Sequence, residues 1–400
     1  MFEFIHCADI HLGCYPNHNE TRFLDFFKAF NNVIDYAIKN NIKLILVSGD
    51  FFQLRAINPK TLDQTINILK KAKDNDLDII AIEGNHDQAY FVDEDSWLLF
   101  LQSQNYLKLL KTKIIDGKIT LSSYENQGNI IESNEYRIIG LDYFGGSTEK
   151  YLLDLHKIIP HSNKFTILML HAAINRLYGQ DMGDVKGEVI LQLKNNVDYL
   201  ALGHIHNRYE LYDFAYNPGS LENIRLRDGL RSDDKGFYHV QVENKKIKNI
   251  KYINSNPRKT IFLRFDVSNI KNPDEVLKLI KDHHEEISCE DIVEVNLYGQ
   301  VDFNPYLIDI NAIKSYFEEK KVVQIEVNNY VNLLNVKHEA NVDDLDMIIS
   351  ELIKDEIKIN YPSTPNPEKL SELILNVTKM LTEEVNEDDI IKTLEDEESI

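Results

Sequence analysis

Five short apolar runs in the first half of the chain each end at a carboxylate, amide or imidazole side chain. The residues that follow the runs are Asp9 with His11, Asp50, Asn85 with His86, His171, and His204 with His206. Apolar runs of this length, bounded by Gly, are typical of buried strands. In open α/β sheets, functional groups gather beyond the carboxyl ends of the strands. The pattern therefore predicts that five separate chain segments converge on one crevice.

The first half of the chain alternates between strands and helices. Apolar runs predict strands at 2–8, 43–48, 77–83, 136–141, 165–170 and 197–202, and amphipathic stretches predict helices at 21–39, 59–74 and 95–104. Alternation of this kind indicates an α/β layered fold. From 207 to 255 the pattern changes to consecutive strand-like pieces, which predict a second, more antiparallel sheet packed on the first.

The second part of the chain divides into smaller units. SNPRK at 255–259 marks a boundary, and the segment after it has the pattern of a βαβαβ unit. Further on, apolar helical faces at 345–353 and 370–381 flank a Pro-rich linker at 361–367. We therefore predict domains at 1–255 and 256–335, a linker with a helix at 336–365, and a helical element with an acidic tail at 366–400.

The net charge of −21 is unfavourable for binding nucleic acid, because phosphates attract positive surfaces. The segment from Glu339 to the end contains 18 acidic and 5 basic residues, so it holds more than half of that charge. Bound divalent cations would make a carboxylate-rich site less negative still. The acidity therefore weakens a DNA-binding interpretation without excluding it.

No apolar run reaches the roughly 18 residues of a transmembrane helix, so we expect no membrane association. The chain begins with a strand rather than a basic leader, and we expect no targeting segment. Its three cysteines, Cys7, Cys14 and Cys289, form no disulfide framework. These features predict a cytoplasmic protein.

The side chains at the strand ends offer oxygen and nitrogen ligands but no sulfur. That set suits Mn²⁺ or a similar divalent ion, and it is large enough for two ions. Two ions about 3.5–4 Å apart clamp the attacking and leaving oxygens of an in-line phosphoryl displacement. Asp50 is the expected bridge because its strand is central, and Asn85 supplies a neutral carbonyl. A single strand-end His is more often structural than a ligand, so only the ordered set indicates a catalytic site.

The longer motifs narrow the interpretation. The strings HCADIHLG, SGDFF, IEGNHD, MLHAAI, YLALGHIHNRYE, YNPGSLE and KGFYHVQV resemble the Mre-eleven/SbcD nuclease family of the calcineurin-like metallophosphoesterase superfamily. The resemblance covers residues 1 to about 255 and continues more loosely through the βαβαβ unit. It implies a four-layer α/β/β/α sandwich with a small DNA-binding capping domain and a helical C-terminal tail.

The resemblance also implies a role for each matching residue. Asp9, His11, Asp50 and His206 would hold one Mn²⁺, and Asp50, Asn85, His171 and His204 would hold the other, with Mg²⁺ or another divalent ion possible at either position. His86 matches a non-ligand histidine that contacts the scissile phosphate and helps the leaving oxygen depart. An imidazole near its ordinary pKa beside the metals is suited to donate that proton. Asp87 would orient the ligands, although a plain turn residue explains it equally well.

One position departs from part of the family. Some members have a His three residues after the bridging Asp, linked to processing of duplex ends, and Gln53 stands there in this chain. Glutamine forms hydrogen bonds but carries no proton at neutral pH, so efficient exonuclease activity on duplex DNA does not follow from the motif. His18, Arg55 and Arg208 are further candidates for substrate contact, with ordinary solvated surface as the alternative.

The resemblance implies three partners: DNA, a second copy of this chain, and a Rad-fifty/SbcC-type ABC ATPase. The family dimerises through helices that correspond to 59–72 and 95–104 here, where ordinary core packing is an equally good explanation. The C-terminal helical faces would dock on the coiled coil of the ATPase, or else cover the protein's own body.

Three functions are compatible with these sequence features. The first is an Mn²⁺-dependent DNA nuclease of double-strand-break repair, with 3'-5' exonuclease activity on duplex ends and endonuclease activity on single strands, working near the nucleoid. The second is a phosphodiesterase or phosphatase for small substrates, which would not need the βαβαβ unit or the helical tail. The third is a mainly architectural subunit that bridges DNA ends. The complete set of metal-ligand residues argues against this third function.

Overall fold

The computed structural model describes residues 1–90, 95–175, 185–283, 287–334, 353–354, 357 and 366–382. The chain forms two compact units, one of Met1–Gly299 with Pro305–Val331 and one of Gln300–Asn304 with Asn332–Ile400. The predicted boundary near residue 255 lies inside the first unit and stays a prediction. Apart from Ile353, the helix predicted at 345–353 lies outside the described residues, as do the linker at 361–365 and the tail from 383.

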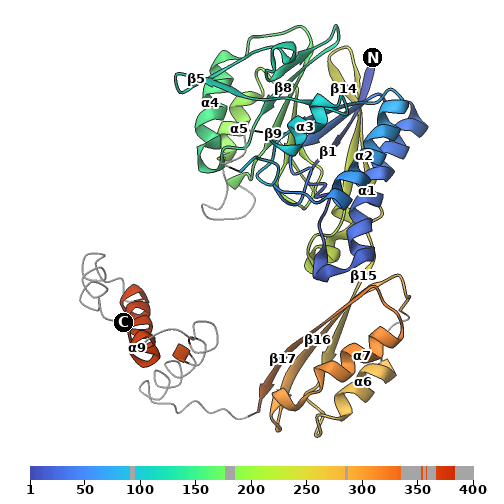
Figure 1. Ribbon diagram of the computed structural model, residues 1–400, viewed down its shortest axis with the longest axis vertical. Helices are drawn as coiled ribbons and strands as arrows, with labels where there is room; N and C mark the ends of the chain where they lie inside the picture. The colour runs from blue at the N-terminus through green and yellow to red at the C-terminus, as the bar shows by residue number, and fades with distance from the viewer. Residues whose placement is uncertain are drawn as a thin grey trace. The chain divides into compact units, whose positions relative to one another are not determined.

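Two six-stranded sheets form the larger part of the first unit (Figure 1). The first has the order β14 (Lys246–Asn254), β13 (Gly236–Glu243), β1 (Phe2–Cys7), β2 (Leu44–Ser48), β3 (Asp78–Ile82) and β4 (Lys108–Leu109). The second has the order β11 (Tyr209–Leu211), β12 (Ala215–Asn217), β10 (Tyr199–Gly203), β9 (Phe165–His171), β8 (Tyr136–Leu141) and β7 (Ile130–Glu132). In the first sheet β1 to β4 run parallel, and β13 and β14 add antiparallel pairs on the other side of β1. In the second sheet the inner strands β12, β10, β9 and β8 run parallel, and the edge strands β11 and β7 are antiparallel.

Side-chain alternation along the strands creates three apolar layers. In β2, Leu44 and Leu46 pack into a core shared with the second sheet, whereas Ile45 and Val47 pack toward helices. The helices on the first sheet are α1 (Glu20–Asn40), α2 (Pro59–Asp74) and α3 (Trp97–Ser103), and those on the second are α4 (Thr148–Ile158) and α5 (Gly187–Leu193). Figure 1 shows α1 and α2 on the opposite side of the sheets from α4 and α5. The predicted four-layer α/β/β/α architecture is confirmed.

Asparagine caps fix the helices that follow the first two strands. The Asn19 side chain accepts a hydrogen bond from the backbone N–H of Arg22 at the start of α1, and Asn58 accepts one from Thr61 at the start of α2. Such caps satisfy N–H groups that have no partner within the helix. The loops that carry Asp9 and Asp50 are therefore held between a buried strand and a capped helix.

The prediction of a separate antiparallel sheet at 207–255 is wrong. β11 and β12 join the second sheet beside β10, while β13 and β14 join the first sheet beside β1. Tyr238, Val240 and Val242 of β13 enter the core between the sheets, and β13 pairs with the edge of β1 that would otherwise be open. The second sheet is instead built mainly from β7 to β10, because the chain changes sheet after β4.

A three-stranded sheet follows, with the order β15 (Thr260–Asp266), β16 (Ile292–Val301) and β17 (Gln324–Leu333). The connecting helices are α6 (Glu275–His283) and α7 (Ile310–Glu319), so the predicted βαβαβ order is confirmed. The remaining elements are β5 (Lys113–Ile115), β6 (Lys118–Thr120), α9 (Pro367–Thr382) and the short helices η1 (Pro16–His18), η2 (Tyr124–Asn126), η3 (Gly145–Ser147), η5 (Leu226–Asp234) and η6 (Pro305–Leu307). Within the described ranges, every helix is too short or too polar to cross a membrane.

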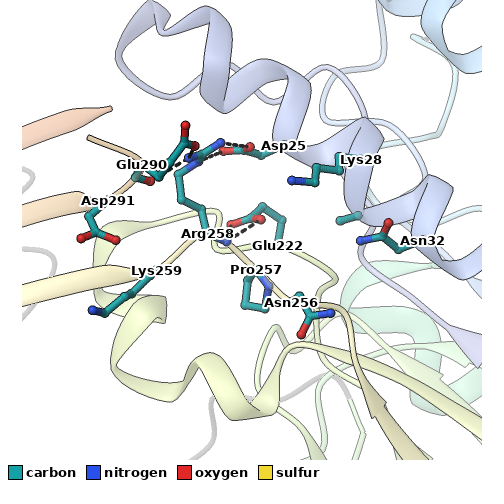
Figure 2. Close-up of a pocket in the computed structure, with 11 residues that line it drawn as sticks. Asp25, Lys28, Asn32, Glu222, Asn256, Pro257, Arg258, Lys259, Glu290 and Asp291 are labelled. Atoms are coloured by element: carbon teal, nitrogen blue, oxygen red, sulfur yellow. Dashed lines mark hydrogen bonds and ion pairs between the residues drawn. The ribbon is translucent and has the colours of Figure 1, made fainter. Parts of the chain in front are cut away.

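Ion pairs hold the segment that leads from β14 to β15. The Arg258 guanidinium donates to both carboxylate oxygens of Asp25 on α1, at 2.6 and 2.7 Å, and to Glu290 Oε2 at 2.9 Å. Glu222 accepts the backbone N–H of Arg258 at 3.0 Å. Figure 2 shows these groups around a polar pocket of about 200 Å³ that Lys28 and Asn32 also line. The predicted boundary sequence is thus a fixed junction between α1 and the three-stranded sheet.

The two six-stranded sheets approach each other closely where β2 and β9 end. A Cβ atom on Gly49 would lie 2.3 Å from Nδ1 of His171, and Gly49 has a φ of +85°. Only glycine combines this backbone conformation with this lack of space. The position of Asp50, the next residue, depends on that approach.

We predict that Gly49→Ala lowers the free energy of unfolding by about 2–4 kcal/mol, since it adds an overlap to the strain of a left-handed residue. The matched control is Gly117→Ala in the turn between β5 and β6, where φ is +72° and no atom lies within 4 Å of the added Cβ. The control should lose about 1–2 kcal/mol. Urea denaturation measures both, and equal losses would show that the two sheets do not need this close approach.

Candidate metal centre

The predicted ligand residues lie together, at the carboxyl ends of strands from both sheets. The first sheet supplies Asp9 and His11 after β1, Asp50 after β2, and Asn85 and His86 after β3, and the second supplies His171 at the end of β9 and His204 and His206 after β10. Their donor atoms form groups within which all atoms lie within 4.8 Å of one another. One group contains Asp9, His11 and His206, a second contains Asp50, His171 and His204, and a third contains His11, Asp50 and His86. The crevice therefore lies between two sheets rather than along the edge of one.

Lone pairs face one another in this cluster. His171 Nδ1 donates to the carbonyl oxygen of Ser48 at 2.8 Å, so Nε2 carries a lone pair whenever the ring is neutral. This Nε2 lies 3.3 Å from Oδ2 of Asp50 and 3.2 Å from Nδ1 of His204. A carboxylate oxygen and an imidazole lone pair repel unless a proton or a metal cation lies between them. The donor set therefore fits a cation.

Asp50 belongs to the second and third groups, and His11 links it to the first. Its Oδ2 is 3.3 Å from Nε2 of His171 and 3.7 Å from Nε2 of His11. His11 Nε2 is in turn 3.2 Å from Nε2 of His206. The carboxylate at position 50 thus faces a histidine of each group, as a residue shared by two ions must.

Burial and the neighbouring charges shift the pKa values of the residues in the cluster. Burial raises the pKa of Asp9 to about 7, with Asp50 contributing in the same direction. Burial opposes charge on His171 as well, but Asp50 and Asp9 raise its pKa to about 9. Burial likewise acts to raise the pKa of Asp50, yet the neighbouring His171 and His11 hold it well below its ordinary value. The negative charges that favour a proton on His171 would equally favour a metal cation beside it.

Several of these residues have an uncommon backbone conformation. The φ angles are 51° for Asp9, 51° for His11, 50° for Asp50 and 88° for His204. A non-glycine residue in this region costs on the order of 1–3 kcal/mol, and such strain gathers at functional sites. Hydrogen bonds offset it here: the Asp9 N–H donates to Gly49 O at 3.1 Å and the His204 N–H donates to Asp9 Oδ1 at 3.0 Å.

His86 is oriented through both its backbone and its ring. Its N–H donates to Asp50 Oδ1 at 3.0 Å, and its ring Nδ1 donates to the carbonyl oxygen of Gln53 at 2.6 Å. Its ring centroid lies 5.1 Å from that of His11. The second bond fixes the tautomer and leaves Nε2 for exchange with a substrate.

Asp87 joins the loops after β2 and β3. It is buried, and its carboxylate accepts the backbone N–H groups of Phe51 at 3.1 Å, Phe52 at 2.9 Å and Gly84 at 3.0 Å. These bonds fix the loop that carries Asp50 relative to the loop that carries Asn85. Asp87 therefore does more than form a local turn.

The four candidates for substrate contact have different surroundings. Arg55 donates to the carbonyl oxygen of Asn85 at 3.2 and 3.3 Å, and the Gln53 carbonyl orients His86, so both lie at the cluster. Arg208 stacks over the ring of Tyr252 at 4.3 Å, with Asp234 3.6 Å away. The exposed His18 packs its ring against Tyr15, 5.5 Å between centroids. Arg208 and His18 do not belong to any metal-ligand group among the described residues.

Two residues near the cluster escaped the sequence analysis. Tyr143 follows β8, and its ring centroid lies 5.5 Å from that of His204 and 5.9 Å from that of His171. Its position at a strand end was a sequence signal, but only carboxylate, amide and imidazole side chains were considered there. The buried His6 links the sheets, with Nδ1 2.9 Å from the Tyr199 hydroxyl and Nε2 3.0 Å from the Leu202 carbonyl oxygen. A strand histidine gives no sequence signal for such a role.

Comparison with known proteins agrees with this site. Residues 2–208 match the calcineurin-like phosphoesterase family, which is more than half of the chain, and the chain belongs to that family. The predicted class, a metal-dependent phosphoesterase, is confirmed.

The relatives narrow the class, as the motifs predicted. The chain is 25% identical to the DNA double-strand break repair protein Mre11 of Sulfolobus acidocaldarius, over 88% of this chain and 90% of that protein. It is 29% identical to Mre11 of Archaeoglobus fulgidus over 57% of this chain and 52% of that protein. It is 24% identical to Mre11 of Methanosarcina acetivorans over 99% of this chain and 59% of that protein. The similarity thus extends beyond the phosphoesterase region, although two of these three relatives are much longer than the part that aligns.

We predict that Mn²⁺ binding at pH 7.5 releases about one proton, because His171, with a pKa of about 9, must lose its proton to act as a ligand. Affinity should therefore rise with pH until about pH 9. Isothermal titration calorimetry in two buffers of different ionisation enthalpy measures the release. His161→Gln, on the exposed surface, should behave like the wild type. Identical binding enthalpies in both buffers would contradict the assigned charge of His171.

Proposed function

We propose that this protein is an Mn²⁺-dependent DNA nuclease of double-strand-break repair, with 3'-5' exonuclease activity on duplex ends and endonuclease activity on single strands. The observation that carries the proposal is Asp50, whose carboxylate faces His11 and His171 of two donor groups and also accepts the N–H of His86. The archaeal Mre11 proteins, similar along most of this chain, support DNA as the substrate.

Two Mn²⁺ ions account for the donor set, with Mg²⁺ or another divalent ion as the alternative. One ion would be held by Asp9, His11, Asp50 and His206, and the other by Asp50, Asn85, His171 and His204. Bound ions of this kind polarise the phosphoryl oxygens, activate the attacking water and neutralise developing charge. A donor set of carboxylate, amide and imidazole groups without sulfur is compatible with Mn²⁺.

The protein's own groups orient the reaction. His86 would donate a proton from Nε2 to the leaving oxygen in its doubly protonated form, and the Gln53 carbonyl, which accepts from Nδ1, holds the ring so that Nε2 is free to face the substrate. Asp87 keeps Asp50 and His86 at a fixed separation by tying their two loops together. Arg55, bound to the Asn85 carbonyl, adds positive charge beside the cluster and is suited to face a DNA phosphate, as His18 and Arg208 are from the flanking loops.

The partners follow from similarity and from surface features. We propose a homodimer through α2 and α3, where Phe100 is 37% exposed although Leu98 and Leu101 enter the protein's own core. We propose that the C-terminal helices, including Leu370, Leu373 and Ile374 of α9, dock on the coiled coil of a Rad-fifty/SbcC-type ATPase. The cytoplasm, at the nucleoid, would be the place of action.

We predict Mn²⁺-dependent cleavage of circular single-stranded DNA and of linear duplex DNA, abolished by EDTA. His86→Ala should lower the rate about 10²–10⁴-fold, since it removes a positioned proton donor. His161→Ala, an exposed histidine away from the site, is the matched control and should cut normally. Cleavage of p-nitrophenyl phosphoesters without cleavage of DNA would favour a small-substrate enzyme. Bound metal with no cleavage of either would favour an architectural subunit.

Gln53 generates a separate prediction. Its backbone carbonyl orients His86, but its side-chain Oε1 is buried and has no hydrogen-bond partner within the described residues. We predict that Gln53→His raises digestion of duplex ends by about tenfold relative to single-strand cutting, because it supplies a second group able to carry a proton. Parallel assays on the two substrates measure the ratio, and an unchanged ratio would show that this position does not limit duplex digestion.

A further inference from the structure

Lys235, immediately before β13, has no exposed surface. Its Nζ donates to the carbonyl oxygen of His206 at 2.7 Å and to Oγ of Ser220 at 3.0 Å, and it lies 3.7 Å from Oδ2 of Asp228. A lysine is almost never fully buried, and burying its charge is costly unless it is paired and hydrogen-bonded. The three partners meet that requirement, and they lie on segments that surround the His206 loop.

The backbone around His206 is held at three successive carbonyls. Asn217 Nδ2 donates to the carbonyl oxygens of Ile205 at 2.7 Å and Asn207 at 2.9 Å. The carbonyl between them, that of His206, accepts from the Ser220 N–H at 3.1 Å as well as from Lys235. These bonds fix the peptide groups on both sides of the His206 side chain. They thereby set the direction of the imidazole, whose Nε2 lies 3.2 Å from that of His11.

Asp228 holds Lys235 from the opposite side. Its Oδ2 also accepts the backbone N–H groups of Ile224 at 3.1 Å and Arg225 at 3.2 Å, so the carboxylate is itself fixed. Asp228 belongs to η5, which packs against β15. Lys235 therefore stands between the loop of a candidate ligand and the segment that contacts the three-stranded sheet.

We propose that Lys235 is a positioning residue that fixes His206 for cation binding, an inference that rests on the ion-binding part of the proposed function. Lys235 acts on the cation in two opposing ways. Its charge repels a cation beside Asp9 and His206, whereas its hydrogen bond keeps the His206 imidazole aimed at His11. The geometry favours the second effect, because the ammonium is compensated by Asp228 while the hydrogen bond to His206 is short.

The test is calorimetric titration of the full chain with Mn²⁺, comparing the wild type with Lys235→Met. We expect two binding events in the wild type, and in the variant one event weakened about tenfold with the other unchanged, since only the group of Asp9, His11 and His206 loses its alignment. Lys251→Met, an exposed lysine on β14, is the control and should titrate like the wild type. Circular dichroism melting verifies that each variant is folded.

The outcomes separate this inference from the proposed function. Equal or tighter Mn²⁺ binding by Lys235→Met would overturn the positioning role, because loss of charge alone strengthens cation binding. Equal weakening of both events would overturn it too, since it would indicate a general loss of structure. A wild type that binds no Mn²⁺ and cuts no DNA would instead reject the proposed function.

A second variant keeps the test decisive if Lys235→Met does not fold. Asp228→Asn retains the size of the side chain and leaves Lys235 in place without the carboxylate that holds it. We expect the same binding event to weaken about two- to threefold, with the other event unchanged. Wild-type affinity for both ions in this variant would overturn the role assigned to Lys235.

Discussion

The whole site depends on the contact between the carboxyl ends of the two six-stranded sheets. Ser48 of the first sheet accepts a hydrogen bond from His171 of the second at 2.8 Å, and His6 of the first lies 3.0 Å from the Leu202 carbonyl of the second. A Cβ atom on Gly203 would lie 2.1 Å from the Ser48 carbonyl oxygen, so the strands cannot approach unless that residue is glycine. Neither sheet alone carries a complete donor set, and the register of this contact decides which side chains face each other.

The contact brings together groups that would repel one another in isolation. Buried carboxylates face buried and half-buried imidazoles within the three donor groups, and Asp9, His11, Asp50 and His204 all have strained backbones. Burial of the apolar layers on either side of each sheet stabilises the fold and offsets the destabilising effect of the strained site. A bound cation would relieve the repulsion, so metal binding and stability of this region are linked. Lys235 and Asp87 have similar roles, because the side chain of each fixes the backbone beside a candidate ligand.

Much of the fold and the site could be predicted from the sequence because their signals are local. Asp50 and His171 stand at the ends of apolar runs, which mark the strand ends in the sequence. The helices α1 and α2 lie within about one residue of the predicted ranges. Sheet membership could not be predicted, because Val240 has the same local pattern whether β13 pairs with β1 or with β12. The roles of His6 and Lys235 were also hidden, since each depends on contacts with residues almost 30 or more positions away. Tyr143 follows β8 and was missed because only carboxylate, amide and imidazole side chains were considered at the strand ends.

Anomalous diffraction from crystals containing Mn²⁺ tests the central claim most directly. Two cations are expected between the sheets, about 3.5–4 Å apart, with Asp50 bound to both. One ion would contact Asp9, His11 and His206, and the other Asn85, His171 and His204. A single peak, or peaks that do not share Asp50, would contradict the two-ion account and with it the chemistry assigned to this site.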